Sequence, residues 1–487
     1  MKFKLPKIEY LLLAGAFILS ALIRLYINFS TEYIPGAVGA YYIVQVKSVI
    51  ENGSIAFKEF PLIFYLEAGL AKLILLVSSK DIVSAVDVAV RIFDAVIPVL
   101  SIIPAFLLVK NILGNTKNKT AIILTASFSI FYISFFTLVS DYQKNSFGLL
   151  WLFFLILFAF KSLNEGGRKN LLFASLFFVL TAVTHFGCFV IAILFLIVLI
   201  AVKLFSERKK LILLISLFAG IIVTALLVLL IFSPSRFGLL EQISGEIFHG
   251  PVLFALLKGY KVLSPGDILN VVFLNGMCFV GLIWYLRNRG NIENGLKVFI
   301  LSVVITCFII SSLFLWSEWA VRFYYIAYIF MIPIFAVLFK FLKSPKLKTK
   351  LYGSLILIML LSAVTTFIKK PVSNMDDSTY KELKLIKSVL PVRGTTMIVA
   401  RLGMHYWAGL ILDTYVGQQS DVRKEWWGRI NHIYYLIQKK DIKPFGPAGL
   451  YGPPFPEPER PKDSYLMFDG NIFQLYSITK PPDNIPD

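Results

Sequence analysis

Charged side chains are scarce in this sequence. Asp, Glu, Lys and Arg make up 16% of its 487 residues, whereas soluble domains contain about 25%. Hydrophobic residues make up 57% of the chain, and they recur in runs of about 20 residues, the length that crosses the hydrocarbon core of a bilayer. The composition excludes a soluble globular protein and predicts a polytopic α-helical membrane protein.

Cysteine is also rare. The three cysteines, Cys188, Cys278 and Cys307, lie within or at the edge of apolar segments, at spacings that suggest neither a metal site nor a disulfide framework. We interpret them as small apolar side chains. The sequence shows no internal repeat, no P-loop and no Rossmann glycine pattern.

Acidic residues are few compared with basic ones. The chain has 29 Asp and Glu against 48 Lys and Arg, a net charge of +19. In a soluble protein this excess would suggest nucleic acid as a partner. Here the basic residues lie between apolar segments, so membrane topology and anionic membrane lipids explain the charge, and no nucleic-acid partner is expected.

The distribution of basic residues predicts the topology. With a cytoplasmic N-terminus and a segment 61–79 that does not cross, 21 basic residues fall in inner segments and 5 in the outer loops from residue 140 onward. A crossing at 61–79 would reverse this bias, so we expect about 11 transmembrane helices in the plasma membrane, with 61–79 dipping into the bilayer or lying in the interface. Glu67 and Lys72 fit that placement better than mid-bilayer. The predicted spans are 9–29, 86–109, 120–139, 146–160, 171–184, 186–205, 211–232, 268–286, 298–315, 323–342 and 351–368.

The chain divides into a transmembrane bundle, residues 1–370, and a small extracytoplasmic α/β domain, residues 371–487. The first outer loop, 30–85, contains an expected in-plane helix in "YYIVQVKSVIENG", which Gly53 caps. The apolar face of this helix comprises Ile43, Val46, Val49 and Ile50.

The tail has its own pattern of elements. "DDSTYKELKLIKSVL" predicts an amphipathic helix capped by Asp377 or Ser378, and "TTMIVA" predicts a strand. "SYLMF" and "IFQLYSI" predict a hairpin that turns at 469–471.

Two acidic residues follow predicted spans at the outer face. Glu32, in "FSTEYIPG", is suited to act as a general base or a metal ligand, and is otherwise a solvated loop residue. Asp141 opens "SDYQKNSFG", with Lys144 and Asn145 one turn on. That set suits a phosphate or sugar site, or else a helix N-cap with a nearby counter-ion.

Further charged residues lie near the same face. Asp87, Arg91 and Asp94 share one helical face; an intrahelical salt bridge facing the bundle is favoured, and contact of Arg91 with a lipid-linked phosphate is the alternative. His185, in "LTHFG", falls at an outer break between apolar runs and is either a satisfied turn residue or part of a site.

Glu318 and Arg322 lie one helical turn apart in "LWSEWAVRFYY". The aromatic residues around them are typical of an interfacial belt. Arginine is also the side chain best shaped to bind a phosphate, and aromatic faces suit a polyprenyl tail or a sugar ring.

The order of these segments resembles the GT-C superfamily of polyprenyl-phosphate-sugar-dependent membrane glycosyltransferases, which includes protein O-mannosyltransferases, aminoarabinose transferases and oligosaccharyltransferases. Five stretches carry the resemblance and cover most of residues 24–335. They are "PGAVGAYYIVQVKSVIENGSIAFKEFPLIFYLEAGLA", "VAVRIFDAVIPVL", "SDYQKNSFGLLWL", "LTHFG" and "WAVRFYYIAYIFMIP". Members of the group usually carry an acid near the position of Gly39, and this chain keeps the following aromatic pair, Tyr41 and Tyr42, without it.

The resemblance implies a transferase that moves a sugar from an isoprenoid phosphate or diphosphate donor to a glycan, lipid or protein acceptor on the outer face. Glu32 or Asp141 would be the base or metal ligand, and a divalent metal is used by some members of the group. Arg322 and Arg91 would bind the donor phosphate, and Lys144 would neutralise the leaving group. The missing acid favours an alternative, a non-catalytic relative that binds or moves a polyprenyl-linked glycan.

Overall fold

The structure, a computed structural model, describes most of the chain. The described residues are 8–36, 38–114, 119–206, 220, 252–257, 263–288, 290, 292–315, 317–369, 372–373, 375–390, 396–419, 422, 430, 432–439 and 457–478.

Contacts along the chain define two compact units. The first comprises residues 1–26, 58–63 and 93–370, and the second comprises 27–57, 64–92 and 371–487. The second unit therefore contains two segments of the expected first outer loop as well as the tail. The division into domains at residue 370 stays a prediction.

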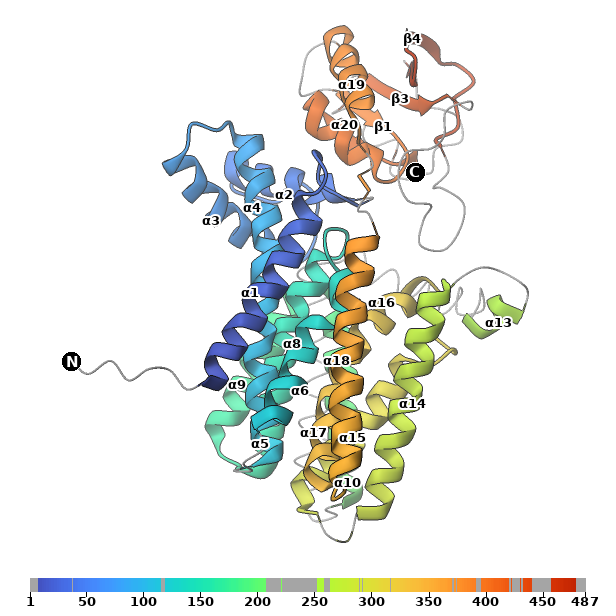
Figure 1. The fold of residues 1–487 in the computed structure, drawn as a ribbon. Helices are drawn as coiled ribbons and strands as arrows, with labels where there is room; N and C mark the ends of the chain where they lie inside the picture. Colours follow the sequence, from blue (N-terminus) through green and yellow to red (C-terminus); the bar gives the residue numbers. More distant parts are fainter. Residues whose placement is uncertain are drawn as a thin grey trace, which may run out of the picture. The chain divides into compact units, whose positions relative to one another are not determined.

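Helices build the whole of the described part of the first unit (Figure 1). The chain enters it through α1 (Ile8–Phe29); only the start of α3 (Leu62–Val77) and the end of α4 (Ile82–Val96) belong to it, and the rest of these two helices lies in the second unit. Two short 3₁₀ segments, η1 (Ile97–Ser101) and η3 (Tyr328–Phe330), continue neighbouring helices. The others are α5 (Ile102–Leu113), α6 (Lys119–Phe131), α7 (Ile133–Thr137), α8 (Gln143–Asn164), α9 (Arg168–Ala182), α10 (Phe186–Ser206), α13 (Val252–Leu257), α14 (Pro265–Asn288), α15 (Asn294–Ile310), α16 (Ser317–Ala327), α17 (Met331–Phe341) and α18 (Pro345–Ile368).

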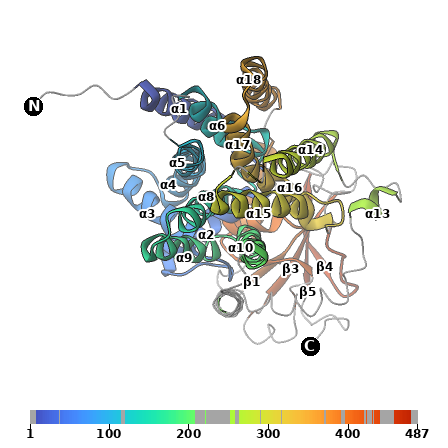
Figure 2. The same cartoon turned by 90° about the horizontal axis from the view of Figure 1, so that it is seen from below.

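The helices differ in how far neighbours surround them. In α17, residues 331–337 are all buried, as expected for a helix that is apolar on every side. By contrast, α18 lies at the rim of the bundle in Figure 2 and exposes large apolar side chains, among them Leu357, Leu360 and Leu361. Lipid is expected to cover such a surface.

The expected spans agree with the helices. Among the described residues, eight helical stretches are long and apolar enough to cross a membrane. The shorter α9 and α15 match two further expected spans, and 211–232 lies outside the described residues. The helix α3 has 16 residues and is likewise shorter than the eight, so whether 61–79 crosses the membrane stays a prediction. The direction in which each helix crosses stays a prediction.

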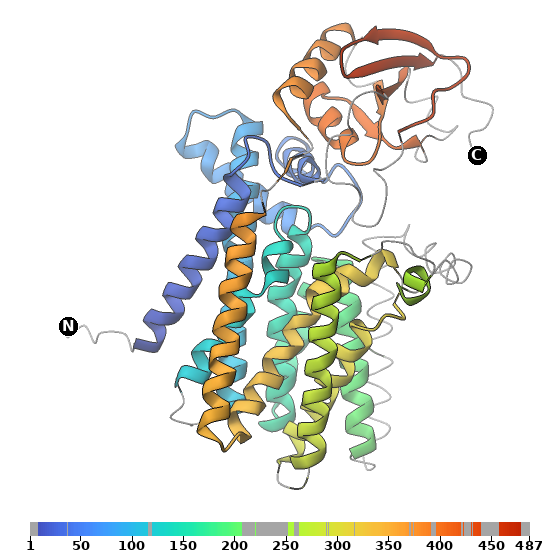
Figure 3. The ribbon, with the colours of Figure 1, turned by 45° about the vertical axis from the view of Figure 1, so that its right-hand side comes forward.

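A five-stranded sheet is the core of the tail. It contains β1 (Thr396–Val399), β2 (Tyr415–Gly417), β3 (His432–Gln438), β4 (Tyr465–Asp469) and β5 (Phe473–Ile478), in the order β2-β1-β3-β5-β4. Strand β1 pairs in parallel with β2 and β3, whereas β3, β5 and β4 are antiparallel. Figure 3 shows β4 and β5 at one edge of the sheet.

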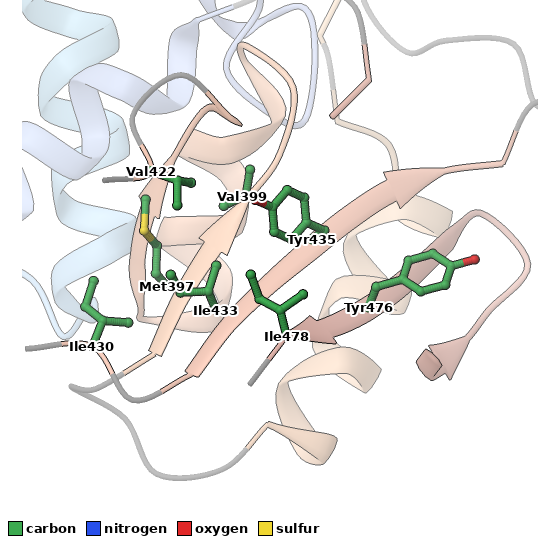
Figure 4. Close-up of a cluster of buried hydrophobic side chains, with 8 residues drawn as sticks. All are labelled: Met397, Val399, Val422, Ile430, Ile433, Tyr435, Tyr476 and Ile478. Atoms are coloured by element: carbon green, nitrogen blue, oxygen red, sulfur yellow. The ribbon is translucent and has the colours of Figure 1, made fainter. Parts of the chain in front are cut away.

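One face of the sheet is covered by a hydrophobic cluster. Alternate residues of β1, β3 and β5 point to the same face because the side-chain period of a strand is two. Figure 4 shows this cluster: Met397, Val399, Val422, Ile430, Ile433, Tyr435, Tyr476 and Ile478. The helices α19 (Asp377–Val389) and α20 (Met404–Leu412) complete the tail.

The expected strand at 396–399 and the hairpin of β4 and β5 are confirmed. The helix α19 is confirmed, but its cap is Asp376, whose carboxylate accepts from the Thr379 amide, and not Asp377 or Ser378. The helix α20 and the strands β2 and β3 were not predicted from the sequence.

The expected helix after the first span is α2 (Gly39–Asn52). It ends at Gly53, whose φ of 73° is the left-handed conformation that glycine adopts without steric cost. Its apolar face is as expected, except that Gln45 is buried too. The Gln45 amide nitrogen donates to the carbonyl of Phe57, and its amide oxygen accepts from the Phe57 N–H, so the buried amide is satisfied.

Candidate functional site

The predicted site residues fall in both units. Asp141, Lys144, His185 and Arg322 belong to the first. The side chain of Glu318 lies outside the described part of the structure. The residues in the second unit are Glu32, Tyr41, Tyr42, Asp87 and Arg91.

Asp141 lies in the turn between α7 and α8 and is partly exposed. The residue before it, Ser140, has φ 68°, a left-handed conformation that costs a non-glycine residue roughly 1–2 kcal/mol. Such strain persists only where surrounding structure fixes it, and it is common at functional sites.

Tyr142 links Asp141 to Arg322. The guanidinium carbon of Arg322 lies 5.7 Å from the centroid of the Tyr142 ring, and Arg322 also hydrogen-bonds the phenol. Burial raises the pKa of Tyr142 to about 12; the positive charge of Arg322 opposes this shift, and the negative charge of Asp141 adds to it. The phenol therefore stays neutral at physiological pH. The charges of an acid, Asp141, and of a cation, Arg322, thus both act on the phenol of Tyr142.

A second tyrosine anchors the helix that carries Arg322. Tyr325, one turn further along α16, donates to a carboxylate oxygen of Asp267 at 2.8 Å. Asp267 also accepts from the amide and hydroxyl of Ser264. These bonds join α16 to the N-terminal end of α14, and the Tyr325 ring contacts that of Tyr142.

Lys144 forms an ion pair that the sequence analysis did not predict. Its ammonium lies 3.1 Å from the carboxylate of Glu59, and both side chains are mostly buried. Glu59 precedes α3 in "FKEFPLIFY", where a charged residue between aromatic residues was the available signal. It adds a third acid to the candidate residues.

His185 caps helix α10. Its Nδ1 accepts from the amide of Cys188 at 3.3 Å, and the residue is 8% exposed. Gly187 makes room for the ring, because a Cβ there would lie 2.8 Å from the imidazole. This geometry is that of the satisfied turn residue.

Two amides at the start of α8 are buried. Gln143 is 0% exposed, and neither of its amide atoms has a hydrogen-bond partner among the described residues. The side-chain oxygen of Asn145 is also buried without a hydrogen-bond partner among the described residues. Buried polar atoms without partners are rare and call for an explanation.

In the second unit, Arg91 is fully engaged with protein atoms. Its Nε pairs with Asp87 at 2.9 Å, so the expected intrahelical salt bridge is confirmed. Its other two nitrogens donate to the carbonyls of Asn28, Thr31 and Glu32. The Glu32 side chain itself is exposed.

The position of Gly39, where the superfamily usually has an acid, leaves no room for a side chain in this structure. A Cβ built on Gly39 would lie 2.7 Å from a methyl carbon of Ile34, which is fully buried. The space for a carboxylate at this position is therefore filled. The aromatic pair that follows is buried, and Tyr41 contacts Phe57 and Tyr406.

Within the described part of the chain, no group of three or more His, Cys, Asp or Glu side chains is arranged to hold a metal ion. The three cysteines are free and buried, as interpreted from the sequence.

No protein-family model matches this sequence, and no curated protein sequence matches it. Solved structures do. ArnT from Cupriavidus metallidurans in the apo state superposes with a TM-score of 0.56 and 11% identity over 95% of this chain and 97% of ArnT. ArnT is also solved bound to undecaprenyl phosphate, with a TM-score of 0.53.

A second similar protein is the oligosaccharyltransferase AglB from Archaeoglobus fulgidus, solved with an inhibitory peptide and a dolichol-phosphate. It matches with a TM-score of 0.53 and 12% identity over 87% of this chain and 69% of AglB. Both proteins are thus solved with a polyprenyl phosphate bound. The chain is a polytopic helical membrane protein with the GT-C fold, as the sequence resemblance predicted.

Proposed function

We propose that this protein transfers a sugar from an isoprenoid phosphate or diphosphate donor to a glycan, lipid or protein acceptor. The observation that carries the proposal is the set of Asp141, Tyr142 and Arg322 in a bundle of this fold. The solved relatives bind dolichol-phosphate and undecaprenyl phosphate, which supports a donor of this class.

The reaction needs a base and positive charge. The acceptor hydroxyl attacks the anomeric carbon, its proton passes to a carboxylate, and the bond from that carbon to the phosphate oxygen breaks. Asp141 is the proposed base, because it is partly exposed and its charge acts on the same phenol, Tyr142, that Arg322 hydrogen-bonds. Glu32 is the second candidate, since it is exposed.

The leaving phosphate needs charge stabilisation rather than covalent help. Arg322 is the proposed phosphate ligand; its guanidinium is held by Tyr142, and the residue as a whole is partly exposed. Lys144 would supply a second charge from its pair with Glu59. Arg91, whose nitrogens bind Asp87 and three carbonyls, would act by holding the turn before Glu32 rather than by direct contact with phosphate.

A second candidate function is a non-catalytic protein that binds or moves a polyprenyl-linked glycan. The packing of Ile34 against Gly39 favours it, because the position that usually bears an acid in this superfamily has no room for one.

We also propose that the reaction takes place outside the plasma membrane, with the N-terminus in the cytoplasm. The basic residues between the spans support this orientation. Cysteines placed at Lys80 and Ser84 should react with an impermeant reagent from outside. Labelling only from inside would contradict the orientation.

The test of the function is direct. Purified protein in lipid nanodiscs is given polyprenyl-phosphate sugars with a labelled sugar, and both free polyprenyl phosphate and sugar-bearing acceptor are measured. Transfer by the wild type, lost in Asp141→Asn, is the expected result. Tight donor binding with no transfer from any donor would favour the second function instead.

A further inference from the structure

A buried ion pair lies directly behind the turn that bears Asp141. Asp94, in the last turn of α4, accepts from the amide of Ser140 at 3.0 Å through one carboxylate oxygen. Its other oxygen accepts from Arg24 of α1 at 2.9 Å. Arg24 is 0% exposed and Asp94 is 1% exposed.

Arg24 extends this network to both ends of the turn. It donates to the carbonyl of Phe135 on α7 and to the hydroxyl of Ser146 on α8. The Ser146 hydroxyl donates in turn to the carbonyl of Leu138. One guanidinium and one carboxylate thus bond to residues on both sides of Asp141: Phe135 and Ser140 before it and Ser146 after it.

Stability alone does not account for such a pair. A buried ion pair is often no more stabilising than well-packed apolar residues of the same size. In addition, the amide that it fixes belongs to Ser140, whose φ of 68° is unfavourable for serine. The pair therefore maintains a strained backbone directly before a partly exposed acid.

We propose that Arg24 and Asp94 are positioning residues for the transfer step: by holding the Ser140 amide, they keep Asp141 in place beside Tyr142 and Arg322. The inference rests on the proposed function in assigning Asp141 as the base. Neither residue touches the substrate. Their loss moves the acid and lowers kcat, while donor binding through Arg322 is retained.

Two double variants separate positioning from folding. Arg24→Met with Asp94→Asn removes the charges but keeps a side-chain oxygen able to accept from Ser140. Arg24→Met with Asp94→Leu removes that oxygen as well. Both avoid an unpaired buried charge, so both are expected to fold, which thermal unfolding in detergent verifies.

The expected result is a difference in kcat between these two variants. The Leu variant should lose about 10²-fold, the scale of a misplaced catalytic group, and the Asn variant much less, with donor Kd equal in both. Adding Ser140→Gly to the Leu variant should restore part of kcat, because glycine adopts a positive φ without strain. A purely structural role for the pair predicts no such rescue.

Hydrogen exchange of the peptide spanning 138–146 gives a second readout that needs no activity. The Leu variant should exchange faster there than the Asn variant. Equal exchange and equal kcat in the two variants would overturn the inference. Faster exchange with a wild type that transfers no sugar would instead reject the proposed function and leave the hold on Ser140 established.

Discussion

The two acidic turns are held in opposite ways. In the second unit, the cation of Arg91 gathers the carbonyls that precede Glu32 and that of Glu32 itself. In the first unit, the anion of Asp94 holds the amide that precedes Asp141. In each turn a buried charge fixes backbone atoms and leaves the acidic side chain accessible.

The comparison shows that a buried charge in an apolar segment can hold the backbone of a neighbouring turn. Arg91 and Asp94 lie three residues apart on α4, yet one pairs with Asp87 and the other with Arg24. Both serve the polypeptide backbone. The charged residues proposed to act in transfer, Glu32, Asp141 and Arg322, are by contrast exposed or partly exposed.

The largest effect should come from breaking the turn before Glu32. Arg91→Met leaves Asp87 unpaired and removes the donors to three carbonyls, and removal of one partner of a buried pair costs about 3–5 kcal/mol. Thermal unfolding in detergent measures the loss. The double variant Arg91→Met with Asp87→Asn is the control and should recover part of the lost stability. An unchanged unfolding temperature in the single variant would show that Arg91 does not hold the turn before Glu32.

A second variant places an acid at position 39, where members of the superfamily usually carry one. Gly39→Asp places a side chain against buried Ile34, and overpacking costs about 1–3 kcal/mol. We expect lower stability and no gain in transfer. Gly39→Asp combined with Ile34→Ala relieves the clash. Higher transfer from the single variant would show that the position is still usable.

A third variant addresses the cation beside Asp141. Arg322→Lys keeps the charge and loses the planar fork that binds two phosphate oxygens. Donor affinity should fall by about 1–3 kcal/mol, the scale of a charge-assisted hydrogen bond. Donor binding in nanodiscs measures this, with Lys384→Arg in the tail as a matched control. Unchanged donor affinity would show that Arg322 does not bind the donor phosphate.

The smallest effect is expected far along the chain from both turns. Burial alone would raise the pKa of Asp376, but hydrogen bonds from Thr379 and Ser378 outweigh it and lower the pKa below 3.8. The stabilisation is thus complete above pH 3.8 and is lost as the pH falls through the lowered value. Asp376→Ala should cost about 1 kcal/mol at neutral pH, measured by thermal unfolding. A cost that grows toward acidic pH would contradict this sign.

The sequence was sufficient for the features that depend on local pattern. Long apolar runs predicted the spans, and the alternation around residues 465–478 predicted the β4–β5 hairpin. The α-helical spacing of Asp87 and Arg91 predicted their ion pair.

Features that depend on contacts distant in sequence were not predictable in this way. Arg24 was not singled out, because its partner Asp94 is 70 residues away. Glu59 was missed because its pairing with Lys144 joins the segment before α3 to the first turn of α8, far apart in sequence. Strand β3 is an apolar run in the sequence, and its place in the sheet is set by pairing with β1 and β5 on either side.

We propose that one of the two accessible acids, Asp141 or Glu32, accepts the proton in the transfer step. Single-turnover transfer and donor binding should be measured side by side for the wild type, Asp141→Asn and Glu32→Gln. We predict that Asp141→Asn abolishes transfer while its donor affinity stays close to that of the wild type, because the amide keeps the size of the side chain but accepts no proton. Full transfer by both variants would contradict the account.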